Sequence, residues 1–140
     1  KEARLREMVV AHLTNRRQWN LEKNMKELLD TEGGFVERFL FFVPLLDEAA
    51  KDSMLISGCS AGSEFIVAKR FGFSRVAGVE IDRSLVDICR VRIEDDTSCE
   101  VAYYDRKKLP YADGQFGTVY SGHVIEHTPN PFEYFKEHFR

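Results

Sequence analysis

A glycine-bearing turn followed by an acidic residue is the pattern in this chain best suited to binding a ligand. The turn runs from Gly58 to Gly62, carries only small side chains between its glycines, and follows the apolar run Met54 to Ile56. Small residues let a ligand approach the backbone N–H groups of a turn, which favours a carboxylate or a phosphate. Glu80 ends a second apolar run about twenty residues later, where a carboxylate can accept hydrogen bonds from two ribose hydroxyls. The pattern predicts a nucleotide-binding site, with Asp82 as the alternative acid.

The same turn disfavours a dinucleotide as the ligand. A dinucleotide-binding turn needs glycine at its third and sixth positions as well. Ser60 and Ser63 stand at those positions. Taken alone, the glycines are also compatible with an ordinary tight turn between a strand and a helix.

The run His123-Val-Ile-Glu-His127 supplies three side chains that could move a proton or bind a metal. It matches the H-x-x-E-H pattern of inverted zinc proteases, in which a helix brings both histidines to one face. Pro129 follows almost at once and leaves little room for a helix, and no third ligand is evident. A zinc hydrolase is therefore a distant alternative, and we expect no metal. His127, His123 and Glu126 are the candidates for acid–base catalysis, although His127 could equally support a loop through hydrogen bonds.

The elements that position these residues alternate between strand and helix from about Ser53 onward. Such alternation predicts an α/β domain with a Rossmann-like, doubly wound parallel sheet. The expected strands are Met54–Ile56, Val76–Glu80, Cys99–Tyr104 and Phe116–Ser121. The expected helices are Ser63–Phe71 with Gly72 as its C-cap, Ser84 to about Glu94 with Ser84 as its N-cap, and one that begins at Pro131.

The first part of the chain has a helical period instead. From Lys1 to about Asp30, apolar residues recur at steps of three and four, which predicts one or two amphipathic helices. Phe35 to Leu46 is a much more apolar helical stretch that we expect to be buried on most sides. We therefore divide the chain into an N-terminal helical cap, 1–46, and a ligand-binding domain, 47–140. The cap could simply bury an apolar face, or its first helix could form a lid over the ligand with Trp19 as a wall.

The composition is that of a single globular domain. The chain has 140 residues, 44% of them hydrophobic, and a net charge of −3 without a long run of like charges. We therefore expect no nucleic-acid partner and no membrane partner. The apolar stretch Phe35 to Leu46 is too short to cross a bilayer. Three cysteines without metal-binding spacing indicate reduced thiols and a cytoplasmic location.

The segment Tyr103 to His127 carries a further set of motifs. Together with the glycine turn and Glu80, these motifs resemble those of the class I S-adenosylmethionine-dependent methyltransferases. The resemblance is greatest to the small-molecule group related to the ubiquinone-biosynthesis enzymes. That family has an acid after the third strand, a Leu-Pro-aromatic step, a turn, a fourth strand, and a Leu-Glu-His-like end before a proline. Here these features fall on Asp105, Leu109-Pro110-Tyr111, Asp113-Gly114, Val119-Tyr120-Ser121 and Ile125-Glu126-His127. The resemblance covers roughly Ser53 to Phe135.

The resemblance implies S-adenosyl-L-methionine as the cofactor and transfer of its methyl group to an unidentified small-molecule acceptor. The glycine turn would face the methionine end of the cofactor, Glu80 its ribose, and Asp105 its adenine amino group. His123 to Glu126 would border the site of methyl transfer. The implied cofactor-binding residues are Gly58, Cys59, Ser60, Gly62, Glu80, Asp105 and His123.

Three positions depart from the family pattern. Ile56 stands where the family usually has an acid that helps hold the ammonium group of the ligand, Ser60 replaces a glycine, and Gly117 replaces an aspartate. These departures leave a second function open, a non-catalytic S-adenosylmethionine-binding or interaction module with the same fold.

The family fold has a seven-stranded sheet, whereas four strands can be read before Arg140. We therefore expect the chain to be the N-terminal part of such a sheet within a longer protein. We also expect the isolated 140-residue chain to self-associate, because the fourth strand would be an open edge.

Overall fold

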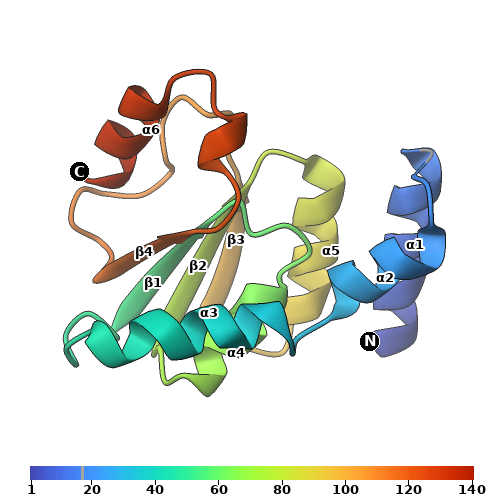
Figure 1. Ribbon diagram of the computed structural model, residues 1–140, viewed down its shortest axis with the longest axis horizontal. Coiled ribbons are helices and arrows are strands. Elements are labelled where there is room, and N and C mark those ends of the chain that lie inside the picture. The colour runs from blue at the N-terminus through green and yellow to red at the C-terminus, as the bar shows by residue number, and fades with distance from the viewer. Residues whose placement is uncertain (17) are drawn as a thin grey trace.

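The computed structural model describes residues 1–16 and 18–140, and a four-stranded parallel sheet lies at its centre (Figure 1). The order of the strands is β3-β2-β1-β4. Their bounds are β1 Ser53–Ser57, β2 Arg75–Glu80, β3 Cys99–Tyr103 and β4 Thr118–Ser121. In this register Leu55 lies opposite both Ala77 and Val119. The predicted parallel α/β sheet is confirmed, with a third strand one residue shorter and a fourth strand two residues shorter than expected.

Within the described residues, six α-helices and two short 3₁₀ turns accompany the sheet. Their bounds are α1 Glu2–Asn15, α2 Leu21–Leu29, α3 Gly34–Phe42, η1 Val43–Leu45, α4 Ser63–Arg70, α5 Arg83–Ile93, η2 Ile125–His127 and α6 Pro131–His138. Gly72 follows α4 with a φ of +91°, the left-handed conformation expected after a helix. The predicted N-cap of α5 is wrong, because the Asp82 side chain accepts the N–H of Ser84 and Ser84 itself lies in the first turn. None of these helices is long and apolar enough to span a membrane.

Strand residues alternate between two layers, as a sheet covered on both faces requires. Met54, Ile56 and Val76 pack against residues of α3, α4 and α5 on one face. On the other face, Leu55 and Val79 pack against side chains of the β3–β4 connection. Figure 1 shows the sheet between α3 and α6.

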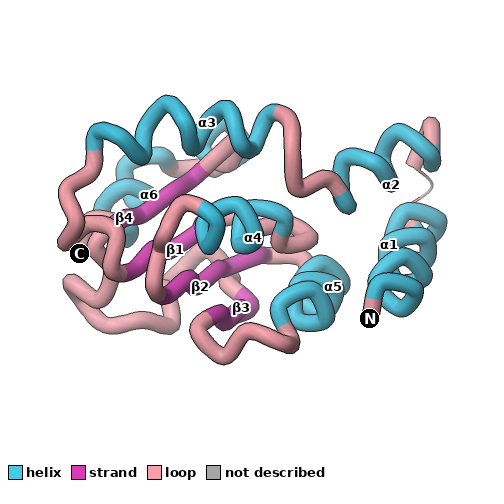
Figure 2. The backbone as a smooth tube through the Cα atoms, turned by 90° about the horizontal axis from the view of Figure 1, so that it is seen from below, coloured by secondary structure: helices cyan, strands magenta, loops and turns pink. Residues whose placement is uncertain are grey.

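The N-terminal helices α1 and α2 lie at one end of the molecule, outside α5 (Figures 1 and 2). Leu5, Val9 and Leu13 of α1 form a buried cluster with Ile88 and Val91 of α5. The predicted apolar stripe is thus used for packing. Trp19 is 91% exposed, which contradicts the alternative in which it forms a wall over a ligand.

The apolar helix α3 is buried along one face only. Phe39 and Val43 belong to the main core, whereas Leu40, Phe41 and Leu45 are exposed. The expectation that this stretch is buried on most sides is therefore wrong, because α3 lies beside α4 on one face of the sheet and its far side faces solvent. Its inner face brings two further side chains, Phe35 and Arg38, to the site described next.

Candidate functional site

A cavity of about 470 Å³ opens at the carboxyl ends of β1, β2 and β4. This volume is within the range of small-molecule and cofactor sites. Ends of neighbouring parallel strands are the usual place for a ligand in such sheets. The residues that line this cavity near the strand ends are Ser57, Gly58 and Ser60 at β1, Glu80 and Ile81 at β2, and Gly122 and His123 at β4.

The glycine turn has a backbone that favours small residues at each of its key positions. Gly58 has a φ of +76°, and a Cβ there would lie 2.3 Å from Cγ2 of Val124 in the loop after β4. Gly62 has a φ of +84° and forms the N-cap of α4. Ser60, where the resembling family has glycine, also has a positive φ of +48°. Gly58 and Ser60 line the cavity, whereas Cys59 is fully buried in the main core and Gly62 packs against Cys89.

Hydrogen bonds inside the protein already occupy most N–H groups of this turn. Those of Gly58 and Cys59 both donate to the Val79 carbonyl, at 2.8 and 3.1 Å. The Gly62 N–H donates to the Cys59 carbonyl at 2.8 Å, and the Ser60 N–H donates to Glu80. These four N–H groups therefore already have acceptors within the protein, and the expectation that the turn receives the carboxylate of a ligand stays a prediction. Another donor would strengthen the binding of a ligand carboxylate at the turn.

Glu80 is the best-fixed polar side chain of the cavity. It is 8% exposed, and its carboxylate accepts three backbone N–H groups, from Ser60 at 2.9 Å, Ile81 at 2.8 Å and Asp82 at 3.0 Å. Two of these bonds fall on Oε1 and one on Oε2, so a lone pair of Oε2 remains for a hydroxyl donor from the cavity. Glu80 thus lines the cavity with an open acceptor, and its role toward a ribose diol stays a prediction. Asp82, the alternative, is engaged by Arg16 and by the N-terminus of α5.

His123 links the loop after β4 to α3. Its Nδ1 lies 3.2 Å from Oε1 of Glu126, and its Nε2 lies 3.1 Å from Nη2 of Arg38. Because a guanidinium can only donate, Nε2 must accept and Nδ1 must carry the proton, a tautomer assigned from these partners. Both ring nitrogens of His123 are therefore occupied, and Glu126, which does not line the cavity, serves as its acceptor.

His127 is the remaining candidate for moving a proton. It lines the cavity from the end of η2, and among residues 1–16 and 18–140 no side-chain hydrogen bond occupies its ring. The 3₁₀ turn Ile125–His127 is three residues long, shorter than the helix that a zinc-binding H-x-x-E-H run requires. Across the described part of the chain, no group of three or more His, Cys, Asp or Glu side chains is arranged to hold a metal ion.

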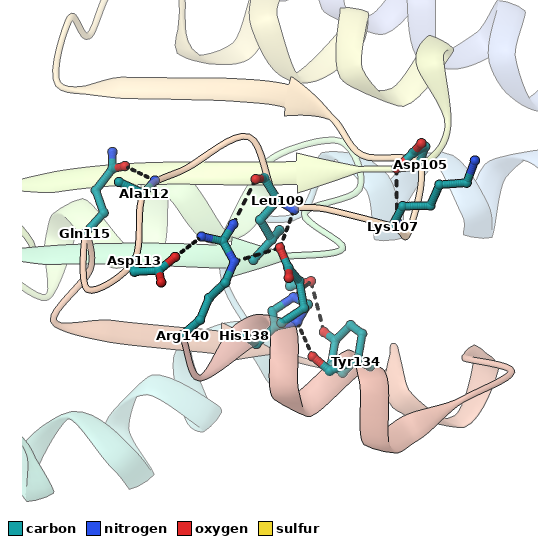
Figure 3. Close-up of polar contacts among 11 residues, drawn as sticks. Asp105, Lys107, Leu109, Ala112, Asp113, Gln115, Tyr134, His138 and Arg140 are labelled. Atoms are coloured by element: carbon teal, nitrogen blue, oxygen red, sulfur yellow. Dashed lines mark hydrogen bonds and ion pairs between the residues drawn. The ribbon is translucent and has the colours of Figure 1, made fainter.

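Asp105 lies just beyond the cavity. It is exposed, and its carboxylate accepts the backbone N–H of Lys107 at 3.0 Å, away from the contacts that α6 makes with Leu109 and Arg140 (Figure 3). Its neighbours Tyr104 and Arg106 line the cavity, Arg106 with a φ of +68°. The role of Asp105 toward an adenine ring stays a prediction.

Helix α6 closes the cavity on the side of β4. Its Tyr134 hydroxyl lies 2.9 Å from Ser57 Oγ and 2.6 Å from Ser121 Oγ, and His138 Nε2 lies 2.8 Å from the same Ser57 oxygen (Figure 3). Arg140 donates to the Leu109 carbonyl at 2.9 Å, which ties the β3–β4 connection to the helix. Burial lowers the pKa of His138, which favours the neutral imidazole. Because Tyr134 is far from the turn in sequence, no local motif indicates its place.

Two charged residues that line the cavity also lie outside the motifs recognised in the sequence. Arg38 comes from α3, and Glu64 comes from the first turn of α4. Glu64 is 7% exposed, and burial raises the pKa of its carboxyl to about 7, against the opposing fields of Arg38 and Arg92. Two features of the sequence point to these residues. Arg38 is a charge within the apolar stretch Phe35 to Leu46, and Glu64 is an acid two residues after the glycine turn.

The three departures from the family pattern lie in different places. Ile56 is 1% exposed and packs in the core, so its side chain is not available to a ligand. Gly117 precedes β4 at the opposite end of the sheet, where a Cβ would lie 2.8 Å from the Ala49 carbonyl oxygen. Its side chain is therefore limited by packing rather than by the cavity. Ser60 alone of the three lines the cavity.

Solved structures share this fold. An S-adenosylmethionine-dependent methyltransferase from Aquifex aeolicus is 17% identical with a TM-score of 0.64, covering 82% of this chain and 59% of that chain. Another from Mesorhizobium loti is 19% identical with a TM-score of 0.63, covering 77% and 48%. Geranyl diphosphate C-methyltransferase from Streptomyces coelicolor A3(2), solved with Mg²⁺, geranyl diphosphate and S-adenosyl-L-homocysteine, is 19% identical with a TM-score of 0.62, covering 74% and 39%. The chain thus spans about half the length of these structures, and at such identities the likeness shows the fold alone.

Sequence comparison is more specific than the structural likeness. No curated protein matches the chain significantly. The family model described as a methyltransferase domain matches residues 55–140, which cover every strand except the start of β1, together with the glycine turn, Glu80 and the loop after β4. This chain belongs to the methyltransferase domain family.

Proposed function

We propose that this protein transfers the methyl group of S-adenosyl-L-methionine to a small-molecule acceptor. The observation that carries the proposal is the Glu80 carboxylate, fixed by the Ser60 N–H at the carboxyl ends of β1 and β2 in a methyltransferase domain. A cytoplasmic location belongs to the same proposal and is supported by three free cysteines. A hydrogen bond to Cys89 and burial raise the pKa of Cys59, as expected of an unreactive thiol.

The residues of the cavity fit this cofactor chemically. A fixed and buried carboxylate suits the ribose diol, and the neighbouring Ile81 and Tyr104 provide apolar and aromatic surface for a purine. Glu64 and Arg38 add one negative and one positive group at the end nearer the glycine turn. The cavity is also large enough for a nucleoside with a side chain, at about 470 Å³.

When bound, S-adenosyl-L-methionine supplies a methyl group on a sulfonium, which is already electrophilic. The task left to the chain is alignment and exclusion of water. Glu80 would hold the ribose, and Phe35, Val124 and Pro129 would keep water from the reacting atoms. An acceptor that must lose a proton would give it to His127 Nδ1 or Nε2, because both nitrogens of His123 are engaged.

The test begins with calorimetric titration of the intact protein with S-adenosylmethionine and S-adenosylhomocysteine. We expect binding of both, and absence of binding to either would contradict the proposal. A methyl-release assay over candidate acceptors, scored by production of S-adenosylhomocysteine, then tests turnover. His127→Gln is the matched variant, expected to bind the cofactor and to lose turnover.

A second candidate function is a module that binds the cofactor without turnover. The burial of Ile56 in the core favours it, because the acid usual in the family at that position is lost. Tight binding of both compounds with no methyl release for any acceptor class would favour this second function. Methyl release that His127→Gln abolishes would favour the first.

A further inference from the structure

An acidic and a basic side chain face the same cavity without pairing with each other. Arg38 reaches it from α3 and Glu64 from α4, and no ion pair within 4.0 Å joins them in the part of the chain that the structure describes. They are near enough for Arg38 to stabilise the charge of the Glu64 carboxylate. The arrangement leaves room between a cation and an anion.

Glu64 is a buried acid that faces Arg38 and Arg92 without an ion pair to either in the described residues. It is 7% exposed, and its carboxylate makes no hydrogen bond to another residue within 1–16 and 18–140, although its own backbone N–H assists it. It lines both the main cavity and a smaller cavity of about 290 Å³ beneath α1 and α2. A carboxylate held out of water is costly unless a cation or several donors satisfy it. Its open side faces the cavities, so a cation from a ligand fits there.

Arg38 is held in place by groups that orient its guanidinium. Nη2 donates to Nε2 of His123 at 3.1 Å, and Nη1 donates to the Tyr120 hydroxyl at 3.5 Å. The guanidinium carbon also lies 5.5 Å from the centre of the Phe35 ring. None of these partners is an anion, so the positive charge of Arg38 is not neutralised by them. A planar guanidinium with free N–H groups matches a carboxylate.

The turn after β1 offers few free N–H donors to the carboxylate of an amino-acid group. The N–H groups of Gly58, Cys59, Ser60 and Gly62 are already hydrogen-bonded within the protein. Position 56, at the centre of β1, carries an isoleucine side chain buried in the core. An anion and a cation from other elements would strengthen the binding of a ligand with an ammonium and a carboxylate, and Glu64 and Arg38 are such a pair lining the same cavity.

We propose that Glu64 and Arg38 together bind the amino-acid end of the ligand, with the Glu64 carboxylate accepting from the ammonium group and the Arg38 guanidinium donating to the carboxylate. The assignment rests on the proposed function, and it makes Glu64 the replacement for the acid that Ile56 does not provide. It also gives His123 the role of a positioning residue that acts through Arg38.

The experiment compares two ligands that differ only in this end. S-adenosylhomocysteine carries the amino-acid group, whereas 5′-methylthioadenosine keeps the nucleoside and the sulfur and lacks it. We expect calorimetric titration of the intact protein to show Glu64→Gln and Arg38→Gln each weakening S-adenosylhomocysteine about tenfold or more. The same variants should leave the affinity for 5′-methylthioadenosine within about twofold. Glu22→Gln, the same change in the exposed first turn of α2, is the matched control and should alter neither affinity.

The outcomes separate this assignment from the proposed function. If the unmodified protein binds neither ligand, the proposed function fails, and this assignment fails with it. If it binds both ligands and Glu64→Gln weakens them equally or not at all, the assignment is overturned while the proposed function stands. Should Glu64→Gln not fold, equal affinity of the unmodified protein for the two ligands, or an unchanged preference in Arg38→Gln, would overturn the assignment as well.

Discussion

The backbone N–H of Ser60 donates a hydrogen bond to Oε2 of Glu80 over 2.9 Å, which joins the turn after β1 to the end of β2. The two residues belong to adjacent parallel strands whose carboxyl ends meet at the cavity. The bond fixes the carboxylate before any ligand arrives, and this reduces the ordering cost of binding. The Glu80 side chain therefore both supports the turn and faces the ligand.

Replacing Glu80 should therefore affect both stability and binding. Glu80→Ala leaves the N–H groups of Ser60, Ile81 and Asp82 without their acceptor. We expect S-adenosylhomocysteine binding to weaken by on the order of 1–3 kcal/mol, with a lower melting temperature. Calorimetric titration and thermal unfolding measure the two effects, and Glu100→Gln on the exposed side of β3 is the control. Unchanged affinity in a folded Glu80→Ala variant would remove Glu80 from the site.

Glu64 should make the ligand-free protein less stable as the pH rises. Burial raises the pKa of its carboxyl from 4.5 to about 7 in the folded state, so the folded state retains a proton that the unfolded state has lost. The free energy of unfolding therefore falls between these two pH values and is then constant above about pH 7. Glu64→Gln removes this loss, and we expect the variant to match the unmodified protein at about pH 4 and to exceed it by up to about 3 kcal/mol at about pH 8.

The measurement is denaturant unfolding of both proteins across this range. His12 and His138 have pKa values lowered by burial, so they change stability in the opposite direction as the pH rises. The difference between variant and unmodified protein isolates Glu64, since both carry these histidines. The charged groups that face Glu64 are Arg38 of α3, Arg92 of α5 and Glu80 of β2. A difference that does not grow with pH would show that the Glu64 carboxyl ionises as it does in water.

Replacing His127 should lower kcat, whereas replacing His123 should lower the affinity for the ligand. His127→Gln removes the imidazole whose ring is not engaged, so we expect kcat to fall by about 10²-fold or more while the dissociation constant of S-adenosylhomocysteine is unchanged. His123→Ala removes the acceptor that orients Arg38, so we expect weaker binding of S-adenosylhomocysteine. Steady-state kinetics and calorimetric titration separate the two effects. Equal losses of kcat in both variants with no loss of affinity would contradict these roles.

The edge strand β4 should lead the isolated 140-residue chain to self-associate. In the described sheet β4 pairs only with β1, Val119 is 41% exposed, and Phe139 at the end of α6 is 84% exposed. An open strand edge beside exposed apolar side chains favours pairing with a second chain. Sedimentation velocity at micromolar concentration should show species larger than the monomer, and Val119→Lys should reduce them. A compact monomer under those conditions would contradict the expectation.

Local patterns predicted the parallel α/β sheet, the glycine turn and Glu80, because each is specified by residues close together in sequence. Strand periodicity and the turn signal of Gly58 to Gly62 need only about twenty residues of context. The resemblance to the methyltransferases rests on the same short-range order and is confirmed by the match over residues 55–140. Errors arose where burial depends on distant neighbours, as for the exposed face of α3 and for Trp19.

What only the tertiary structure decided is how the charges around the cavity are shared among elements. Arg38, Glu64 and Tyr134 come from three separate helices and carry no common motif, so no spacing along the chain could bring them together. The hydrogen bonds of the turn are equally hidden, because the partners Val79 and Glu80 lie on the next strand. Sequence determines which residues form each element through local periodicity and turn chemistry. Packing between elements far apart in the chain determines which side chains share a cavity and which donors remain free for a ligand.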